Sequence, residues 1–287
     1  MPRCLLKNNV PMLRLFRYMV LLAAVTLLIS SCATLSGSGV GRVKHYVVES
    51  ERVPPAFDGF DIVFLSDLHF PSKFTPKRLA KLVGRVRELS PDMLLFGGDY
   101  APSPEYAGLL FSSFSSVETA HGKYAVLGNH ERRFATSSVR GIMERGGVCL
   151  LSDECVHIVQ GGDTLSLVGV GDSFRPSQAL LDMVEGLSPG AYSIVLSHTP
   201  DFAQDTGVGA DLVLSGHTHG GQVSLLGFYA PVTNSKYGNR FLSGRNITDE
   251  GVIVITTNGV GTSRRKMRFC VPSEIVVVTL RRVVRNF

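Results

Sequence analysis

Residues 61–69 read Asp-Ile-Val-Phe-Leu-Ser-Asp-Leu-His, an apolar run that ends in a carboxylate and an imidazole two residues apart. The run from Ile62 to Leu65 is short and consists of strand-forming apolar residues, which predicts a buried strand. In open α/β sheets, ligands bind at the carboxyl ends of such strands. Asp67 and His69 therefore occupy the position where an α/β fold builds its functional site.

Four more apolar runs end in polar motifs of the same kind. These runs span residues 93–96, 124–127, 194–196 and 212–214. The motifs that follow them are Gly98-Asp99, Gly128-Asn129-His130-Glu131, Ser197-His198 and Gly216-His217-Thr218-His219. Carboxylates, imidazoles and an amide thus recur at strand ends, and these side chains bind divalent metals in proteins. Five motifs in this arrangement indicate one shared site.

The potential ligands are too many for one four-coordinate ion. They are Asp67, His69, Asp99, Asn129, His198, His217 and His219. We expect two divalent ions that share a bridging carboxylate, with His130 left as an imidazole without a metal. In extended backbone, residues i and i+2 point to the same side, so Asp67 and His69 can reach one ion, as can His217 and His219. No motif contains cysteine, which excludes a thiolate site. Carboxylate, amide and imidazole ligands suit Mn²⁺, Fe and Zn²⁺ alike.

The motif order D-x-H, G-D, G-N-H-E, H and G-H-x-H resembles that of the calcineurin-like metallophosphoesterase superfamily. The resemblance covers roughly residues 44–281 and includes the segments 219–222 (His-Gly-Gly-Gln) and 259–263 (Gly-Val-Gly-Thr-Ser). These later blocks resemble the bacterial branch that joins one phosphoesterase domain to an N-terminal membrane segment. The resemblance implies an α/β fold of two packed mixed β-sheets flanked by helices, with the site at their shared edge.

The resemblance also implies a role for each motif residue. The first metal would be held by Asp67, His69 and His219, and the second by Asn129, His198 and His217. Asp99 would bridge the two ions, and His130 would protonate the leaving oxygen or stabilise its charge. The implied reaction is hydrolysis of a phosphoester or pyrophosphate bond by a hydroxide that bridges two Mn, Fe or Zn ions.

The family pattern narrows the substrate. Protein Ser/Thr phosphatases follow Gly-Asp with Asp-Arg-Gly, whereas here Asp99 is followed by Tyr100-Ala-Pro-Ser-Pro, which argues against that subgroup. Some enzymes in or near the resembled branch hydrolyse UDP-2,3-diacylglucosamine, so we expect a lipid-linked or cell-envelope phosphate of this kind. The alternatives are a general phosphodiesterase or phosphomonoesterase of the cell envelope, and a non-catalytic binding module, which would be expected to have lost ligands.

The positive charge is concentrated at the N-terminus. Four of the 29 basic residues and no acidic residue lie in residues 1–31, so the rest of the chain has 25 basic against 24 acidic residues. The net charge of +5 thus indicates a targeting segment and not a nucleic-acid-binding face. We expect a monomer with no nucleic-acid partner.

An uncharged apolar stretch, residues 18–29, follows the basic residues, as in a secretory signal. It is shorter than the roughly 20 residues of a spanning helix. Residues 29–32 (Ile-Ser-Ser-Cys) resemble a lipoprotein cleavage box, so we favour a signal over residues 1–31, an acylated Cys32, a tether over 32–43 and a domain over 44–287. The alternative is an uncleaved anchor helix from about Tyr18 to Gly37. In both interpretations the domain is membrane-anchored and lies on the outer side of the cytoplasmic membrane or in the periplasm.

Several local features complete the prediction. Thr75-Pro76 predicts the start of a helix that ends before Ser90-Pro91, and further helices are expected around 105–115, 137–145 and 177–186. Residues 156–168 read as a hairpin, and 252–255 and 275–280 as late strands. Two questions stay open in the sequence. Arg264, Arg265 and Arg268 either clamp a phosphate or belong to a solvated face, and Cys149 and Cys155 either pair or remain thiols.

Overall fold

The computed structural model describes residues 14–23, 25, 33–35, 39–71, 74–187, 191–225, 229–263 and 266–284. Residues 14–23 are helical, and their apolar side chains, such as Phe16 and Met19, are exposed. Within the described ranges, no helix has the length and apolar character needed to cross a membrane. Cys32, Arg264 and Arg265 lie outside the described residues.

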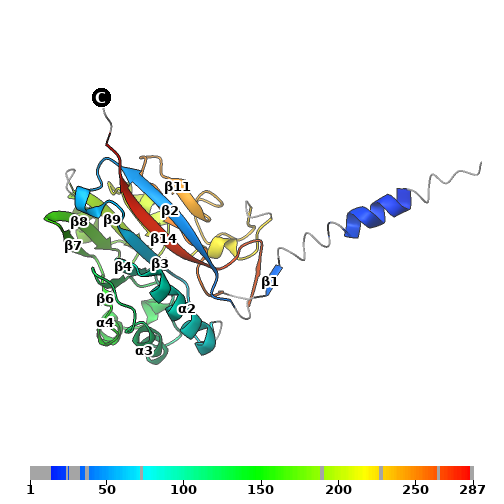
Figure 1. Ribbon diagram of the computed structural model, residues 1–287, viewed down its shortest axis with the longest axis horizontal. Coiled ribbons are helices and arrows are strands. Elements are labelled where there is room, and N and C mark those ends of the chain that lie inside the picture. The colour runs from blue at the N-terminus through cyan, green and yellow to red at the C-terminus, as the bar shows by residue number, and fades with distance from the viewer. Residues whose placement is uncertain are drawn as a thin grey trace, which may run out of the picture.

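Two six-stranded mixed sheets form the centre of the domain (Figure 1). The first has the order β2 (Arg42–Ser50), β14 (Glu274–Arg282), β3 (Asp61–Leu65), β4 (Met93–Phe96), β5 (Lys123–Ala125) and β6 (Cys149–Leu150). The second has the order β11 (Gly244–Ile247), β12 (Ile253–Thr256), β10 (Leu212–Ser215), β9 (Tyr192–Ser197), β8 (Asp163–Gly169) and β7 (Glu154–Gln160). A separate two-stranded sheet pairs β1 (Ala33–Leu35) with β13 (Met267–Phe269).

Helices cover the outer faces of both large sheets. The first sheet packs against α2 (Pro76–Leu89), α3 (Pro104–Ser113) and α4 (Thr136–Arg145). The second packs against α5 (Gln178–Glu185) and α6 (Asp201–Thr206). Three short 3-10 helices complete the described elements: η1 (Pro55–Phe57), η2 (Glu131–Arg133) and η3 (His219–Gly221). The predicted fold, two mixed sheets flanked by helices, is therefore confirmed.

Strand β3 shows why the apolar runs are continuous. Ile62 and Phe64 lie in the core between the two sheets, together with Leu212 of β10. Val63 and Leu65, which alternate with them, lie in the core under α2, α3 and α4. Both faces of the strand are buried, so the alternation of polar and apolar residues seen in half-exposed strands is absent.

Most local predictions are confirmed with small shifts in boundaries. Helix α2 begins at Pro76, and the Thr75 hydroxyl accepts a hydrogen bond from the Arg78 N–H. The hairpin is formed by β7 and β8, which pair antiparallel. Cys149 and Cys155 are both free thiols. Strand β2, the long first strand of the domain, was not expected from its sequence and begins at Arg42, before the predicted domain boundary.

Candidate metal centre

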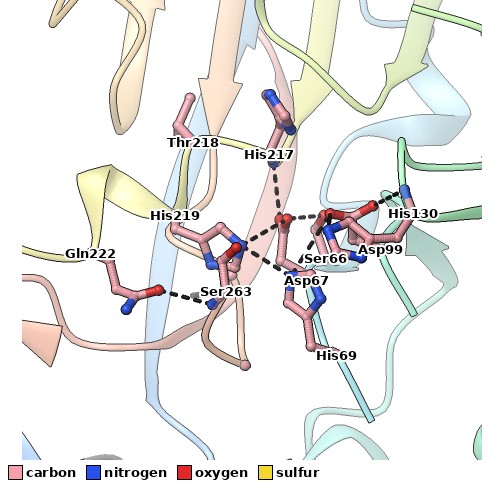
Figure 2. A network of polar contacts seen from close by, with 12 residues as sticks. Ser66, Asp67, His69, Asp99, His130, His217, Thr218, His219, Gln222 and Ser263 are labelled. Carbon is pink, nitrogen blue, oxygen red and sulfur yellow. Dashed lines mark hydrogen bonds and ion pairs between the residues drawn. The ribbon is translucent and has the colours of Figure 1, made fainter. Parts of the chain in front are cut away.

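The five motifs meet at one edge of the two sheets. Strands β3, β4 and β5 run parallel in the first sheet, and β9 and β10 run parallel in the second. Their carboxyl ends therefore lie on the same side of each sheet, and the loops that follow them converge (Figure 2). All eight residues predicted for the site lie within this cluster. They are Asp67, His69, Asp99, Asn129, His130, His198, His217 and His219.

Asp67, His69 and His219 form the first group of potential ligands. One ligand atom of each lies within 4.8 Å of the others. His69 Nε2 is 3.1 Å from His219 Nε2, and His219 Nε2 is 3.4 Å from Asp67 Oδ1. Atoms bonded to one ion at about 2.0–2.2 Å must lie this close together, so the group has the spacing of a metal site.

Asp99, His198 and His217 form a second group of the same dimensions. His198 Nε2 is 3.1 Å from His217 Nδ1 and 3.1 Å from the Asn129 side-chain oxygen. The amide oxygen of Asn129 is thus directed at the same point as the two imidazoles. Together with Asn129, this group contains the residues that the resemblance implies for the second metal, including the bridging Asp99.

Asp99 lies between the two groups. Its Oδ1 is 3.6 Å from His198 Nε2 in the second group, and its Oδ2 is 3.7 Å from His69 Nε2 in the first. Each carboxylate oxygen therefore faces a different group, an arrangement that allows Asp99 to bridge two ions.

His130 lies at the edge of this cluster. Its Nε2 is 3.8 Å from Asp99 Oδ2, and its side chain is 43% exposed. The rings of His130 and His69 meet edge to face with centroids 4.8 Å apart. His130 also forms a third possible ligand group with His69 and Asp99.

The sequence argument had assumed an extended backbone at the motifs, but the backbone there is not extended. The φ angles are 57° at Asp67, 48° at His69, 58° at Asp99, 68° at His217 and 54° at His219. These residues lie in the left-handed region, which non-glycine residues adopt at some cost in conformational energy. The i, i+2 argument was therefore wrong in its physical basis, and His217 and His219 belong to different groups.

The electrostatics favour cations. Burial, the largest cause, raises the pKa of Asp67 and of Asp99. Burial likewise lowers the pKa of His217 to about 3 and that of His219 well below its usual value. Burial also opposes protonation of His198, but Asp99 and Asp67 outweigh it and raise its pKa. Buried carboxylates beside the imidazoles of His217 and His219, whose lowered pKa values favour the neutral form, form a set of electron-pair donors that a divalent ion would stabilise.

One buried atom supports this fit independently of pKa. Asp67 Oδ1 has no hydrogen-bond partner among the residues that the structure describes. The other oxygen, Oδ2, accepts hydrogen bonds from the Ser66 hydroxyl at 2.7 Å and the His217 N–H at 3.0 Å. A buried carboxylate oxygen without a partner is unfavourable, and a cation in the first group would supply that partner.

Hydrogen bonds from outside the groups orient the ligands. His198 Nδ1 lies 2.7 Å from the Gly97 carbonyl oxygen, so Nδ1 carries the proton and Nε2 is left with a lone pair. The buried Glu131 carboxylate accepts hydrogen bonds from the N–H groups of Asp99, Tyr100 and Gly128 at 2.9–3.0 Å. Glu131 is thus a structural carboxylate, and it fixes the loops after β4 and β5.

Arg268 has a role that the sequence did not predict. Its side chain is buried and not part of an exposed cluster. Two hydrogen bonds of 2.6 Å join its Nη2 to the carbonyl oxygens of Asn258 and Gly261. The same Nη2 also lies 3.2 Å from the Gly259 carbonyl oxygen and 3.4 Å from His219 Nδ1. Arg268 therefore organises the loop behind the first group.

Two cavities open at the centre. The first, about 320 Å³, is lined by the site residues Asp99, Asn129, His130, His217 and His219 together with Asn234 and Ser263. The second, about 240 Å³, shares His219, Asn234 and Ser263 with it and is otherwise lined largely by apolar and backbone groups. Asn234 carried no motif signal in the sequence, whereas Ser263 ends the Gly-Val-Gly-Thr-Ser segment noted there. Only the structure shows that both residues line the two cavities.

Comparison with known proteins places this geometry in a family. The family model described as calcineurin-like phosphoesterase matches residues 60–221, which carry all eight site residues. The chain belongs to the calcineurin-like phosphoesterase family. It is 34% identical to "Phosphodiesterase YaeI" of Escherichia coli over 71% of this chain and 76% of that protein. It is 28% identical to "Uncharacterized metallophosphoesterase YkuE" of Bacillus subtilis over 87% and 92% of the two chains.

Solved structures of similar arrangement include a dimetal phosphatase from Danio rerio, at 12% identity and a TM-score of 0.47 over 77% of this chain and 99% of that chain. As a member of the calcineurin-like phosphoesterase family, the protein is a hydrolase of a family that uses divalent metal ions, and its candidate ligands are present. The individual ligand roles, and the number and identity of the ions, remain predictions.

Proposed function

We propose that this phosphoesterase binds two divalent ions, Mn, Fe or Zn, and hydrolyses a phosphodiester or pyrophosphate bond in a lipid-linked or cell-envelope substrate. The position of Asp99 is the observation that supports two ions, because its two oxygens face different ligand groups at 3.6 and 3.7 Å. When bound, the ions would supply Lewis-acid activation of the phosphoryl group and of water.

The residues of this chain have separate tasks in that reaction. Asp67, His69 and His219 would hold one ion, Asn129, His198 and His217 the other, and Asp99 both. His130, half-exposed where the cavity meets solvent, would donate a proton to the leaving oxygen. Asn234 and Ser263 line the same cavity and offer hydrogen bonds to the substrate.

The bond class is supported by the relative that is named as a phosphodiesterase. A screen of the Mn²⁺-loaded full chain should find bis-nitrophenyl phosphate cleaved faster than nitrophenyl phosphate. UDP-2,3-diacylglucosamine is the specific lipid-linked candidate, and its hydrolysis at a rate above the soluble diester would support it. Hydrolysis of the diester alone would favour a general envelope phosphodiesterase, and a preference for the monoester would contradict the proposal. The Asp99→Ala variant is the control for contaminating activity.

A non-catalytic binding module is the second candidate. Such a module would be expected to lack ligands, whereas all seven predicted ligand positions are filled and clustered in this chain. If the protein binds both ions but turns over none of the substrates, the binding module becomes the better interpretation.

Attachment to the membrane through an acylated Cys32 is the proposed location, with an uncleaved helix as the alternative. Mass spectrometry of the native N-terminus separates the two, since acylation gives a chain that begins at Cys32 and an anchor helix leaves Met1 intact. Cys32→Ser should leave an unacylated precursor that is processed slowly. The nucleotide candidate is cytoplasmic, so an acylated Cys32 would count against UDP-2,3-diacylglucosamine.

A further inference from the structure

Strand β13 joins the N-terminal segment to a loop beside the metal centre. On one edge β13 pairs with β1, where Ala33 lies opposite Phe269. On the other edge Phe269 forms a parallel bridge with Val223, and hydrogen bonds of 3.0 Å connect it to Gln222 and Ser224. Since neighbouring strands lie about 4.8 Å apart, the backbone of Val223 is about 10 Å from that of Ala33.

This loop region is rich in exposed apolar side chains. Their exposed fractions are 40% for Val223, 65% for Leu225, 56% for Tyr229, 52% for Val232 and 41% for Met267. Leu225 and Tyr229 face each other across an antiparallel bridge, so the loop folds back on itself there. A cluster of large apolar side chains left in contact with water indicates a docking surface. We call these five residues the apolar rim.

The apolar rim is continuous with the metal centre. Val223, Val232 and Met267 also line the 240 Å³ cavity. That cavity shares His219, Asn234 and Ser263 with the cavity of the metal centre. Whatever covers the apolar rim therefore lies at the entrance to the site.

We propose that the apolar rim docks on the lipid bilayer to which the N-terminal segment is attached, so that the metal centre opens at the membrane surface. The inference rests on the proposed membrane attachment. If Cys32 is acylated, the next residue, Ala33, already belongs to β1. If instead an uncleaved helix anchors the chain, it ends before β1 and not at Gly37, and the four residue steps from Ile29, the end of the apolar stretch, to Ala33 span at most about 14 Å.

Either form of attachment holds β13 close to the bilayer, and the rim is the apolar surface beside it. Interfacial side chains enter the head-group region by about 5–10 Å, a depth within reach of a loop this near the anchor. The exposed Lys266, next to Met267, suits anionic head groups.

The absence of tryptophan from the sequence permits a direct test with the full chain. Single-tryptophan variants Leu225→Trp and Tyr229→Trp would be bound to phosphatidylethanolamine–phosphatidylglycerol vesicles with brominated acyl chains. We expect a blue shift and loss of emission for both. The matched control is Val159→Trp, equally apolar and 61% exposed on β7, at the opposite side of the domain from β1 (Figure 1). Its emission should not change.

A second variant tests the apolar contact itself. Leu225→Glu in the Tyr229→Trp background should restore emission, and Val159→Glu in the same background should not. Equal emission from the Tyr229→Trp and Val159→Trp chains, with both sedimenting with vesicles, would overturn the proposal. Failure to sediment would overturn the attachment and the docking together. Hydrolysis of soluble bis-nitrophenyl phosphate, measured in parallel, reports the catalytic function separately, because Leu225 and Tyr229 are outside the described cavities.

Discussion

Asp99 is the residue on which the two-ion assignment depends. Because its oxygens face both ligand groups, Asp99→Ala should lower occupancy at both ions, whereas His69→Ala should mainly empty one. Metal analysis of the purified variants measures this difference. A metal content in Asp99→Ala equal to that of the wild type would refute the assignment.

A variant of His130 distinguishes a role in the chemical step from a role in metal binding. If it protonates the leaving oxygen, His130→Ala should retain its metal while kcat falls by about 10² to 10⁴. The loss should be greater for an alkoxide leaving group than for nitrophenolate, which departs without a proton. Metal analysis and kcat on the two substrates are the measurements.

Two results would change this assignment. Metal loss in proportion to activity would make His130 a ligand, for which its group with His69 and Asp99 provides the geometry. Equal losses on both substrates, with metal retained, would leave an electrostatic or positioning role.

The ends of β4 and β5 are held together by Glu131 in η2. Its carboxylate satisfies three buried N–H groups, and each unsatisfied buried donor costs about 1–3 kcal/mol. Glu131→Ala should therefore lower the free energy of unfolding by about 3 kcal/mol or more, as measured by urea denaturation. The exposed Glu144 of α4 is the control, and Glu144→Ala should have little effect. Similar losses in the two variants would contradict this role.

At the level of elements, the sequence predicted those whose signal is local. Runs such as 93–96 are apolar throughout because both faces of the strand are buried. Strand β2 has no such run, since most of its residues are at least partly exposed, and it was missed. Strand β14 was read as a late strand, but its insertion between β2 and β3 depends on long-range pairing that no local pattern encodes.

The side chains of the site could be predicted from the sequence, but the backbone conformation that positions them could not. The ligands are recognisable because their residue types follow buried strands. The left-handed turns at Asp67 and Asp99 cannot be recognised in the sequence, because aspartate tolerates several backbone conformations. Arg268 is buried because carbonyl groups of a loop that folds around it accept its hydrogen bonds. Its charged neighbours in the sequence suggest an exposed cluster instead, so this burial could not be predicted.

At the scale of the whole molecule, each ligand group spans both sheets. Asp67 and His69 follow a strand of the first sheet and His219 one of the second, and Asp99 faces His198 and His217 in the same way. Ligands that bind only the native state stabilise it, by about 2.7 kcal/mol at a free concentration of 100 times Kd. Chelation should therefore lower Tm by several degrees, as measured by calorimetry, and readdition of Mn²⁺ should restore it. Asp99→Ala should respond much less, and an unchanged wild-type Tm would contradict metal binding across the sheets.

The place of β14 has a consequence for biosynthesis. This strand, residues 274–282, lies between β2 and β3, parallel to one and antiparallel to the other. A nascent chain that has emerged only as far as β13 therefore has both of those edges open, and open edges favour pairing with other chains. The first sheet cannot close until the final strand has left the ribosome. Closure of the first sheet thus waits for the one of its strands that is synthesised after all the others, and until then β2 and β3 have no partner between them.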